Sequence, residues 1–303
     1  MELLYLLEKV RLPIVNEIML GITYLGDEIA FLAIALILFW CVDKKQGYFI
    51  LSVGFVGTLL NQFLKLWFRI PRPWVKDPNF TILEQAREGA SGYSFPSGHT
   101  QSSVGTFGSI AYSTRNKILR IISIAIAILV PFSRMYIGVH TPLDVFVSVG
   151  IALVLVFVLH PVIYKNDGKA IPVLIVIMSL AALCYLCFVE FYPFPGDIDP
   201  DNLASGVKNA YTLIGALGGL VFVYIVERKW INFSTDAIWW AQILKVVLGL
   251  LVGLALKSSL NAPLTALLGE KAGRVLRYFI LVCFAGVVWP LTFCWFGKLG
   301  RKE

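Results

Sequence analysis

The stretch that organises this chain runs from Phe95 to Asp144 and reads FPSGHTQSSVGTFGSIAYSTRNKILRIISIAIAILVPFSRMYIGVHTPLD. It contains two of the chain's three histidines, His99 and His140, and each lies beside an apolar run of membrane type. Titratable side chains at the edge of hydrocarbon are costly and usually serve a function or a specific partner. The stretch therefore combines the pattern of membrane helices with candidate reactive groups.

The composition predicts a membrane protein. Hydrophobic residues make up 58% of the 303 residues and charged residues only 15%, which is too little polar surface to cover a soluble domain of this size. Apolar runs approach or exceed the ~18–20 residues that cross a bilayer. We therefore expect an all-α fold, a polytopic transmembrane helical bundle. The runs cover about 25–42, 48–68, 97–112, 118–132, 142–164, 170–192, 208–226, 238–258 and 275–297.

The first 24 residues mix Leu and Ile with charged residues and are interrupted by Pro13. This pattern is typical of an amphipathic segment that lies at the membrane interface. Met1 is not followed by a basic region or a small-residue cleavage site, so no removable signal peptide is expected.

The formal net charge of +7 comes from bases scattered in short loops, which favours a topological role over nucleic-acid binding. If all nine runs span the membrane, most bases collect on one face. The positive-inside rule then places this basic face and the C-terminus in the cytoplasm, and the candidate site on the other side of the cell (plasma) membrane. The basic face contains Lys44, Lys45, Arg115, Lys117, Arg120, Lys165, Lys169, Arg228, Lys229, Lys298, Arg301 and Lys302.

The five cysteines all lie in apolar segments. Cys184 and Cys187 form a C-x-x-C pair, but no other ligand-type residue is near them in sequence. We expect small buried thiols and no metal or redox site.

His140 and Asp144 are four residues apart at the start of a predicted helix, so they share one face. A carboxylate on one imidazole nitrogen fixes the tautomer and leaves the other nitrogen basic, which makes the histidine a candidate nucleophile. Alternatively, the two residues form a satisfied pair at the membrane interface. Pro142 suits the first turn of this helix.

Ser97, Gly98 and His99 lie where another helix is expected to start. Glycine permits close approach of the backbone to a ligand, and a helix start offers free N–H groups to an anion. Ser97 adds a hydroxyl donor, and His99 is a candidate acid–base group. Alternatively, Ser97 only caps the helix and His99 is a polar interface residue.

Lys65, Arg72 and Arg134 supply positive charge near these groups in sequence. Arginine binds phosphate oxygens in a bidentate way, while lysine acts as a point charge. Together they are able to neutralise the oxygens of a phosphoryl group in the transition state. Taken singly, each is better explained by a base that snorkels to the interface.

The spacings combine into three motifs, K-x6-RP (Lys65 to Pro73), PSGH (Pro96 to His99) and S-R-x5-H-x3-D (Ser133 to Asp144). This pattern resembles the type 2 phosphatidic acid phosphatase (PAP2, or lipid phosphate phosphatase) superfamily, which is related to vanadium haloperoxidases. The resemblance covers roughly residues 20–165. It implies a PAP2-like helical core at 25–165, preceded by the interfacial segment 1–24 and followed by additional transmembrane helices at 166–303.

The resemblance implies hydrolysis of a phosphate or pyrophosphate through a phosphohistidine, without a metal or another cofactor. His140 would attack phosphorus, Asp144 would orient it, and His99 would protonate the leaving group and then activate water. Lys65, Arg72, Ser97, Gly98 and Arg134 would bind the phosphate. The third histidine, His160, is expected to be structural.

The residues leave several functional alternatives open. The substrate could be polyprenyl pyrophosphate, phosphatidate, phosphatidylglycerophosphate, a sphingoid phosphate or a sugar phosphate. Transfer of the phosphoryl group to a lipid acceptor is one variant. A non-enzymatic transporter or scaffold is the alternative from a different functional class. The extra helices could shape a lipid entrance, form a homodimer interface or carry another activity. Expected partners are the phosphorylated lipid and membrane lipids, with no nucleic acid.

Overall fold

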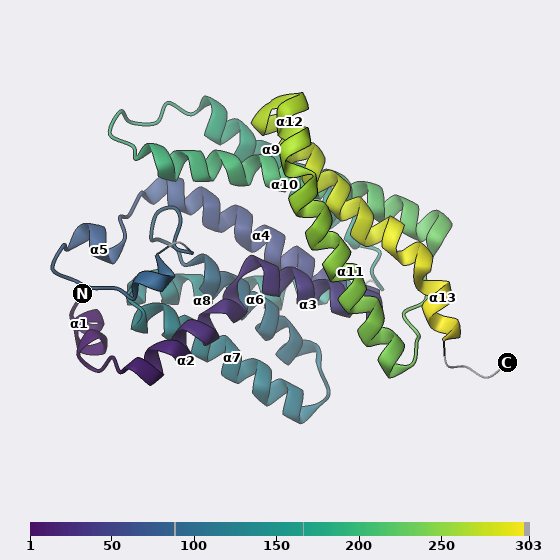
Figure 1. Cartoon of the computed structure of the whole chain (residues 1–303), viewed down its shortest axis with the longest axis horizontal. Helices are drawn as coiled ribbons and strands as arrows, with labels where there is room; N and C mark the ends of the chain where they lie inside the picture. Colours follow the sequence, from purple (N-terminus) through teal and green to yellow (C-terminus); the bar gives the residue numbers. More distant parts are fainter. Residues whose placement is uncertain (88, 166, 300–303) are drawn as a thin grey trace. The chain divides into compact units, whose positions relative to one another are not determined.

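The computed structural model describes residues 1–87, 89–165 and 167–299 and confirms the all-α prediction. Every regular element in this part of the chain is a helix (Figure 1). The elements are α1 (Glu2–Lys9), α2 (Pro13–Thr23), η1 (Tyr24–Gly26), α3 (Glu28–Cys41), α4 (Lys44–Phe68), α5 (Pro73–Lys76), η2 (Glu84–Ala86), α6 (Gly98–Ser113), α7 (Lys117–Tyr136), α8 (Pro142–Tyr164), α9 (Ile171–Phe191), α10 (Pro200–Val226), η3 (Glu227–Ile231), α11 (Trp239–Ser259), α12 (Asn261–Cys283), η4 (Phe284–Val288), η5 (Trp289–Thr292) and α13 (Phe293–Lys298).

The described residues contain seven segments long and apolar enough to cross a membrane. The bent pair Pro13–Gly26 and Glu28–Cys41, with a 53° angle between its parts, passes the same test only as a pair. Two of the nine expected runs form helices too short to pass this test singly: α3 has 14 residues, and α6 has 16, the length of its expected run. The seven segments are Lys44–Lys76, Lys117–Tyr136, Pro142–Tyr164, Ile171–Phe191, Pro200–Ile231, Trp239–Ser259 and Asn261–Lys298. The chain is therefore a multi-span membrane protein, as predicted.

Helix starts near the candidate site follow from local sequence. The Ser97 hydroxyl caps α6 by accepting from the Thr100 N–H at 3.4 Å, and the Asn116 side chain caps α7 by accepting from the N–H groups of Ile118 and Leu119. Pro142 occupies the first position of α8, as predicted, where its missing N–H costs nothing.

The described chain divides into two compact units. Unit 1 consists of Met1–Leu32, Phe49–Val162 and Pro193–Gly206, so it contains every predicted site residue. Within it, α7 packs against α1, α2, α6 and η1. His160 packs edge-on against the rings of Phe49 and Tyr112 in the same unit, which agrees with a structural role.

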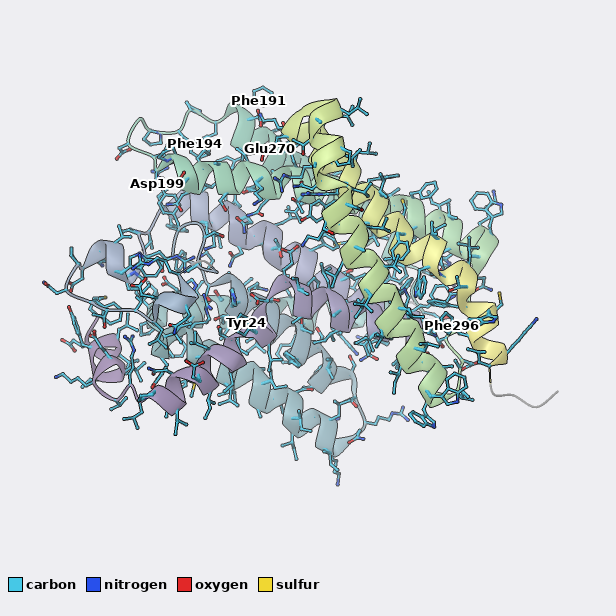
Figure 2. All side chains as sticks on the ribbon, in the orientation of Figure 1. Tyr24, Phe191, Phe194, Asp199, Glu270 and Phe296 are labelled. Atoms are coloured by element: carbon cyan, nitrogen blue, oxygen red, sulfur yellow. The ribbon has the colours of Figure 1, made fainter. Side chains whose placement is uncertain are left out.

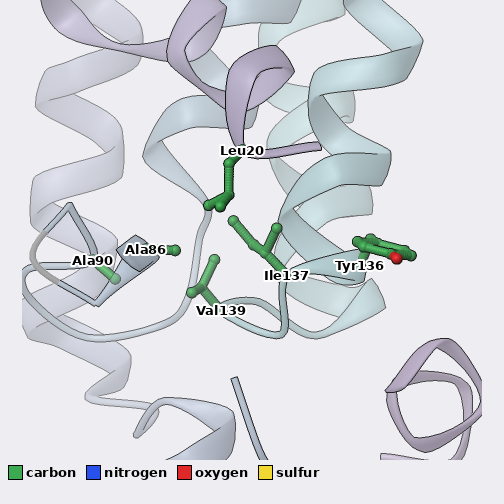
Figure 3. Packing of buried hydrophobic residues seen from close by; sticks show 6 residues of the cluster. All are labelled: Leu20, Ala86, Ala90, Tyr136, Ile137 and Val139. Carbon is green, nitrogen blue, oxygen red and sulfur yellow. The ribbon is translucent and has the colours of Figure 1, made fainter. Parts of the chain in front are cut away.

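A hydrophobic cluster in unit 1 packs beside the three sequence motifs (Figure 3). It joins Leu20 of α2 to the two alanines that flank the turn after η2 and to the chain at the end of α7. Gly138, at φ +89°, follows this helix end, and a Cβ there would lie 2.8 Å from the Arg11 guanidinium. The turn at Gly138 is therefore tightly packed, and it leads directly into His140. The cluster contains Leu20, Ala86, Ala90, Tyr136, Ile137 and Val139.

Unit 2 consists of Ala33–Tyr48, Ile163–Tyr192 and the chain from Val207 onward. Within it, α11 packs against α12, α13 and η4. Glycines let α10 approach α12, because a Cβ on Gly215 would lie 2.3 Å from the Val275 carbonyl oxygen. The expected basic residues Arg301 and Lys302 lie outside the described residues. A lipid entrance, a dimer interface or another activity in this part of the chain stays a prediction.

Candidate active site

The predicted site residues come together in unit 1 from three separate segments, the end of α4 with the start of α5, the start of α6, and the end of α7 with the start of α8. Most are deeply buried, although Gly98 and His99 keep partial exposure. The set is Lys65, Arg72, Ser97, Gly98, His99, Arg134, His140 and Asp144.

The imidazole of His140 has its two nitrogens in different surroundings. The Arg72 Nη1 lies 3.0 Å from Nε2. A guanidinium only donates hydrogen bonds, so Nε2 accepts this bond and the proton of the neutral ring is on Nδ1. Nδ1 lies 3.6 Å from the Asp144 Oδ2, which is too long for a hydrogen bond. His140 and Asp144 therefore lie close together, as predicted. The ring proton faces Asp144, but no direct hydrogen bond joins the two residues.

Asp144 is held rigidly by other groups. Its Oδ2 accepts the Ser94 hydroxyl at 2.6 Å and the Thr141 N–H at 2.7 Å. The Thr141 hydroxyl accepts the Asp144 N–H at 3.3 Å, so the two residues form a capping box at the start of α8. Ser94 was missed by the sequence reasoning, because a serine in a turn-rich loop carries no distinguishing signal.

Arg72 ties the loop before α6 to the loop before α8. Its Nε donates to the Gly92 carbonyl at 3.0 Å and its Nη2 to the Ser91 carbonyl at 2.8 Å. Its Nη1 also donates to the Val139 carbonyl at 3.0 Å. Arg72 therefore has a scaffolding role that its predicted role in phosphate binding did not include.

Arg134 and Lys65 place further positive charge in the site. Arg134 is 2% exposed, and its Nη1 donates to the Thr23 hydroxyl at 2.7 Å. Its Nε and Nη2 are buried and have no hydrogen-bond partner among the described residues. Buried donors of this kind are costly unless a ligand completes them. Lys65 donates to the Tyr93 carbonyl.

The start of α6 carries the remaining predicted groups. The Ser97 N–H donates to the Asp144 carbonyl at 3.2 Å, which joins this motif to the third one. The His99 Nε2 lies 2.8 Å from the Asp27 Oδ1. Asn61 is buried near Gly98, and its amide has no hydrogen-bond partner in the described part of the chain. Sequence reasoning missed Asp27 as a partner of His99, because it lies far away along the chain.

Electrostatics keep both histidines of the site neutral when no anion is bound. Burial, followed by the charge of Arg72, lowers the pKa of His140 well below 6.5. Burial and the charge of Arg134 lower the pKa of His99 to about 4, whereas Asp27 acts in the opposite direction. A neutral His140 retains the lone pair that a nucleophile needs.

A cavity of about 670 Å³ opens beside Arg72 within unit 1. Its lining comes from the chain around α5, from the Ala90–Tyr93 loop, from the start of α10 and from the residues just before it, among them Asp199 (Figure 2). No group of three or more His, Cys, Asp or Glu side chains among the described residues is placed to hold a metal ion. The arrangement combines a neutral, oriented imidazole with buried cationic donors, and this suits nucleophilic attack on a phosphorus centre.

The chain belongs to the PAP2 superfamily. The family model described as "PAP2 superfamily" matches residues 45–167, and the one described as "PAP2 superfamily phosphatase, transmembrane extension" matches residues 211–302. These matches confirm the predicted membrane phosphatase class.

Named relatives agree with this assignment. Phosphatidylglycerophosphatase B of Bacillus subtilis is 34% identical over 49% of this chain and 75% of its own length. Undecaprenyl-diphosphatase BcrC of the same organism is 30% identical over 47% and 74%, respectively. An undecaprenyl-diphosphatase of Sulfolobus acidocaldarius is 29% identical over 48% and 68%. A crystal structure of a transmembrane PAP2-type phosphatidylglycerolphosphate phosphatase from Bacillus subtilis is 31% identical and covers 55% of this chain and 84% of that one, with a TM-score of 0.45.

Proposed function

We propose that the protein hydrolyses a lipid phosphate or pyrophosphate through a phosphohistidine at His140, without a metal ion. The observation that carries the proposal is the pairing of an unprotonated Nε2 on His140 with buried arginine donors. A scaffold or transporter has no need for an oriented nucleophile. The proposal therefore favours an enzyme over that alternative class.

In the first step, the Nε2 lone pair of His140 forms a bond to phosphorus while the bond from phosphorus to the leaving oxygen breaks. His99, protonated once the dianionic substrate is bound, gives its proton to that oxygen. Arg72 Nη1 turns from Nε2 to a phosphate oxygen. Lys65 and Arg134 neutralise the other oxygens, and Asp144 offsets the positive charge that develops on the ring of His140.

In the second step, His99 takes a proton from water as the water oxygen attacks phosphorus. The bond from phosphorus to His140 Nε2 breaks, and inorganic phosphate leaves. Ser97 and the Gly98 N–H hold the phosphate during both steps, because a helix start stabilises an anion. An alcohol in place of water would give the transferase variant.

The substrate is proposed to be an amphiphile whose tail remains in the membrane. The cavity beside Arg72 falls within the volume range of head-group-sized ligand sites. The names of the relatives support phosphatidylglycerophosphate and undecaprenyl pyrophosphate as the first candidates. A phosphate monoester and a pyrophosphate share the chemistry described above, so the choice between them is left to the assay.

The proposed test is phosphate release by purified protein in detergent with EDTA. The substrates are phosphatidylglycerophosphate, undecaprenyl pyrophosphate, phosphatidate, a sphingoid phosphate and glucose 6-phosphate, and His140→Ala is the control. EDTA-insensitive release from a lipid, absent in the variant, supports the proposal. Release from glucose 6-phosphate alone would replace the lipid by a sugar phosphate. No release from any substrate would contradict hydrolysis and favour transfer or a scaffold.

We also propose that the protein lies in the cell membrane with the site facing away from the cytoplasm. The support is the distribution of bases in the sequence. With the expected spans, the loop that carries Arg115 lies on the basic face and the loop that carries Asn79 lies on the opposite face. Single cysteines at these two exposed positions, in a background without native cysteines, are labelled in whole cells with a membrane-impermeant maleimide. Labelling at position 79 only supports this orientation, and labelling at position 115 only reverses it.

A further inference from the structure

The bend between α2 and α3 is built against the active site. Thr23, the last residue of α2, accepts a hydrogen bond from Arg134, and Asp27, just before α3, contacts His99. Gly26 makes this approach feasible, because a Cβ there would lie 2.9 Å from the His99 carbonyl oxygen and 2.8 Å from Val130 Cγ1. The bend lies at Tyr24 in Figure 2. The bend lies outside both regions matched by the family models, because the first of these regions begins at residue 45.

We propose that Asp27 is a positioning residue, which holds His99 through Nε2 and leaves Nδ1 to exchange the proton with the leaving oxygen and then with water. The inference rests on the proposed acid–base role of His99. In the acid step, the Nδ1 proton moves to the leaving oxygen as its bond to phosphorus breaks. The ring is then neutral, with its remaining proton on Nε2 facing the carboxylate. In the second step, Nδ1 takes a proton from the attacking water.

The contacts of Asp27 support a role beyond capping α3. The backbone of Asp27 makes the hydrogen bonds to the adjoining helices: its N–H donates to the Tyr24 carbonyl, and its carbonyl accepts from the Phe31 N–H. Its carboxylate instead lies 2.8 Å from the imidazole of His99. The carboxylate also opposes the burial and the Arg134 charge that lower the pKa of His99. It therefore favours the protonated ring that an acid catalyst requires.

The test compares kcat/KM for two substrates with leaving groups of different quality. The substrates are phosphatidate, whose alkoxide needs a proton to leave, and p-nitrophenyl phosphate, whose phenolate leaves without one. The variants are Asp27→Asn, Asp27→Ala, His99→Ala and the double variant Asp27→Asn/His99→Ala. Because kcat/KM covers only the steps up to release of the leaving group, the later attack by water does not affect the comparison. The ratio of the two values is also independent of the fraction of folded enzyme.

The measured ratio is kcat/KM for phosphatidate divided by kcat/KM for p-nitrophenyl phosphate. We expect both Asp27 variants to lower this ratio by about tenfold or more, which is a part of the ~10²–10⁴ that acid–base catalysis contributes. The double variant should be no worse than His99→Ala, since Asp27 acts through that ring. The matched control is Asp77→Asn, which removes the carboxylate that accepts the Tyr5 hydroxyl in the same unit. It should leave the ratio unchanged.

Two results would overturn the role of Asp27. One is an unchanged ratio in the Asp27 variants, with or without an equal loss on both substrates; the other is a lower ratio in the double variant than in His99→Ala. These results differ from a failure of the underlying mechanism. If His99→Ala itself leaves the ratio unchanged, His99 is not the acid, and the proposed function fails at that residue. If His99→Ala lowers the ratio and the Asp27 variants do not, only the inference about Asp27 fails.

Discussion

His140 shows how one side chain is prepared for reaction before substrate arrives. Arg72 occupies Nε2, so the neutral ring carries its proton on Nδ1, on the side of Asp144. The burial and cationic charge that surround the ring disfavour its protonation. A phosphate that draws Arg72 away would expose the Nε2 lone pair and supply the compensating negative charge.

The first prediction concerns the protonation of His140. Its lowered pKa means that the ring stays neutral as the pH falls through the usual histidine range and charges only below it. With only three histidines in the chain, ¹⁵N NMR of histidine-labelled protein in detergent resolves each ring, and His99→Gln and His160→Gln provide the assignments. We expect unprotonated Nε2 on His140 at about pH 6. A ring that titrates at or above 6.5 would contradict this account.

The second prediction concerns Ser94, whose hydroxyl donates to Asp144 at 2.6 Å. Ser94→Ala should lower kcat by about tenfold, because a hydrogen bond to a buried charged group contributes about 1.5–3 kcal/mol. The matched control is Ser148→Ala, because that hydroxyl donates to the Asp144 backbone carbonyl instead of the carboxylate. Equal effects of the two changes on steady-state kinetics would show that the carboxylate does not depend on Ser94.

The third prediction concerns the shape of the Arg134 side chain. One of its nitrogens binds Thr23, and two others have no described partner. Arg134→Lys keeps the charge but loses this fork, so we expect kcat/KM to fall by about tenfold to a hundredfold. Arg120→Lys is the control, because this arginine donates to the backbone carbonyls of Ala111 and Thr114 at the end of α6. Near-normal kinetics for Arg134→Lys would mean that the residue does not bind phosphate.

At the level of elements, the sequence predicted the helix starts at Gly98 and Pro142 well, because Ser97 and proline are local signals. The expected run at about 97–112 also matches the 16 residues of α6, but the sequence did not predict that α2 and α3 form a bent pair. α6 buries polar residues such as Gln101 and Thr106, and a hydropathy pattern does not distinguish a protein-facing run from a lipid-facing one. The contact of Asp27 with His99 depends on that bend, so it was missed as well.

The fourth prediction belongs to the bend. Gly26→Ala should destabilise the protein by about 1–3 kcal/mol through overpacking against Val130 and His99, and it should also lower activity. Gly21→Ala is the matched control, because nothing lies within 4 Å of the added methyl group and alanine favours the helix. Thermal unfolding in detergent measures both variants. Equal stability of Gly26→Ala and wild-type protein would show that the bend tolerates a wider separation from α6.

At the level of the molecule, the motif spacings were sufficient to predict the membrane phosphatase class, because the three motifs together resemble those of the PAP2 superfamily. The division into two units was not readable in the same way. Pro193–Gly206 belongs to the unit that contains the three sequence motifs, although it lies far beyond them in sequence. Its Asp199 N–H donates to the Tyr93 hydroxyl at 3.3 Å. Such pairings depend on tertiary packing, which no local pattern encodes.

The most direct test of the central claim is to trap the covalent intermediate. His99→Ala should accumulate it with ³²P-labelled p-nitrophenyl phosphate, because this substrate needs no acid and the variant lacks the base that activates water. After an alkaline quench, we expect label on His140, stable to base, lost in acid and absent from His99→Ala/His140→Ala. Label on another residue, or phosphate release by the wild-type enzyme with no label in either protein, would contradict a phosphohistidine at His140.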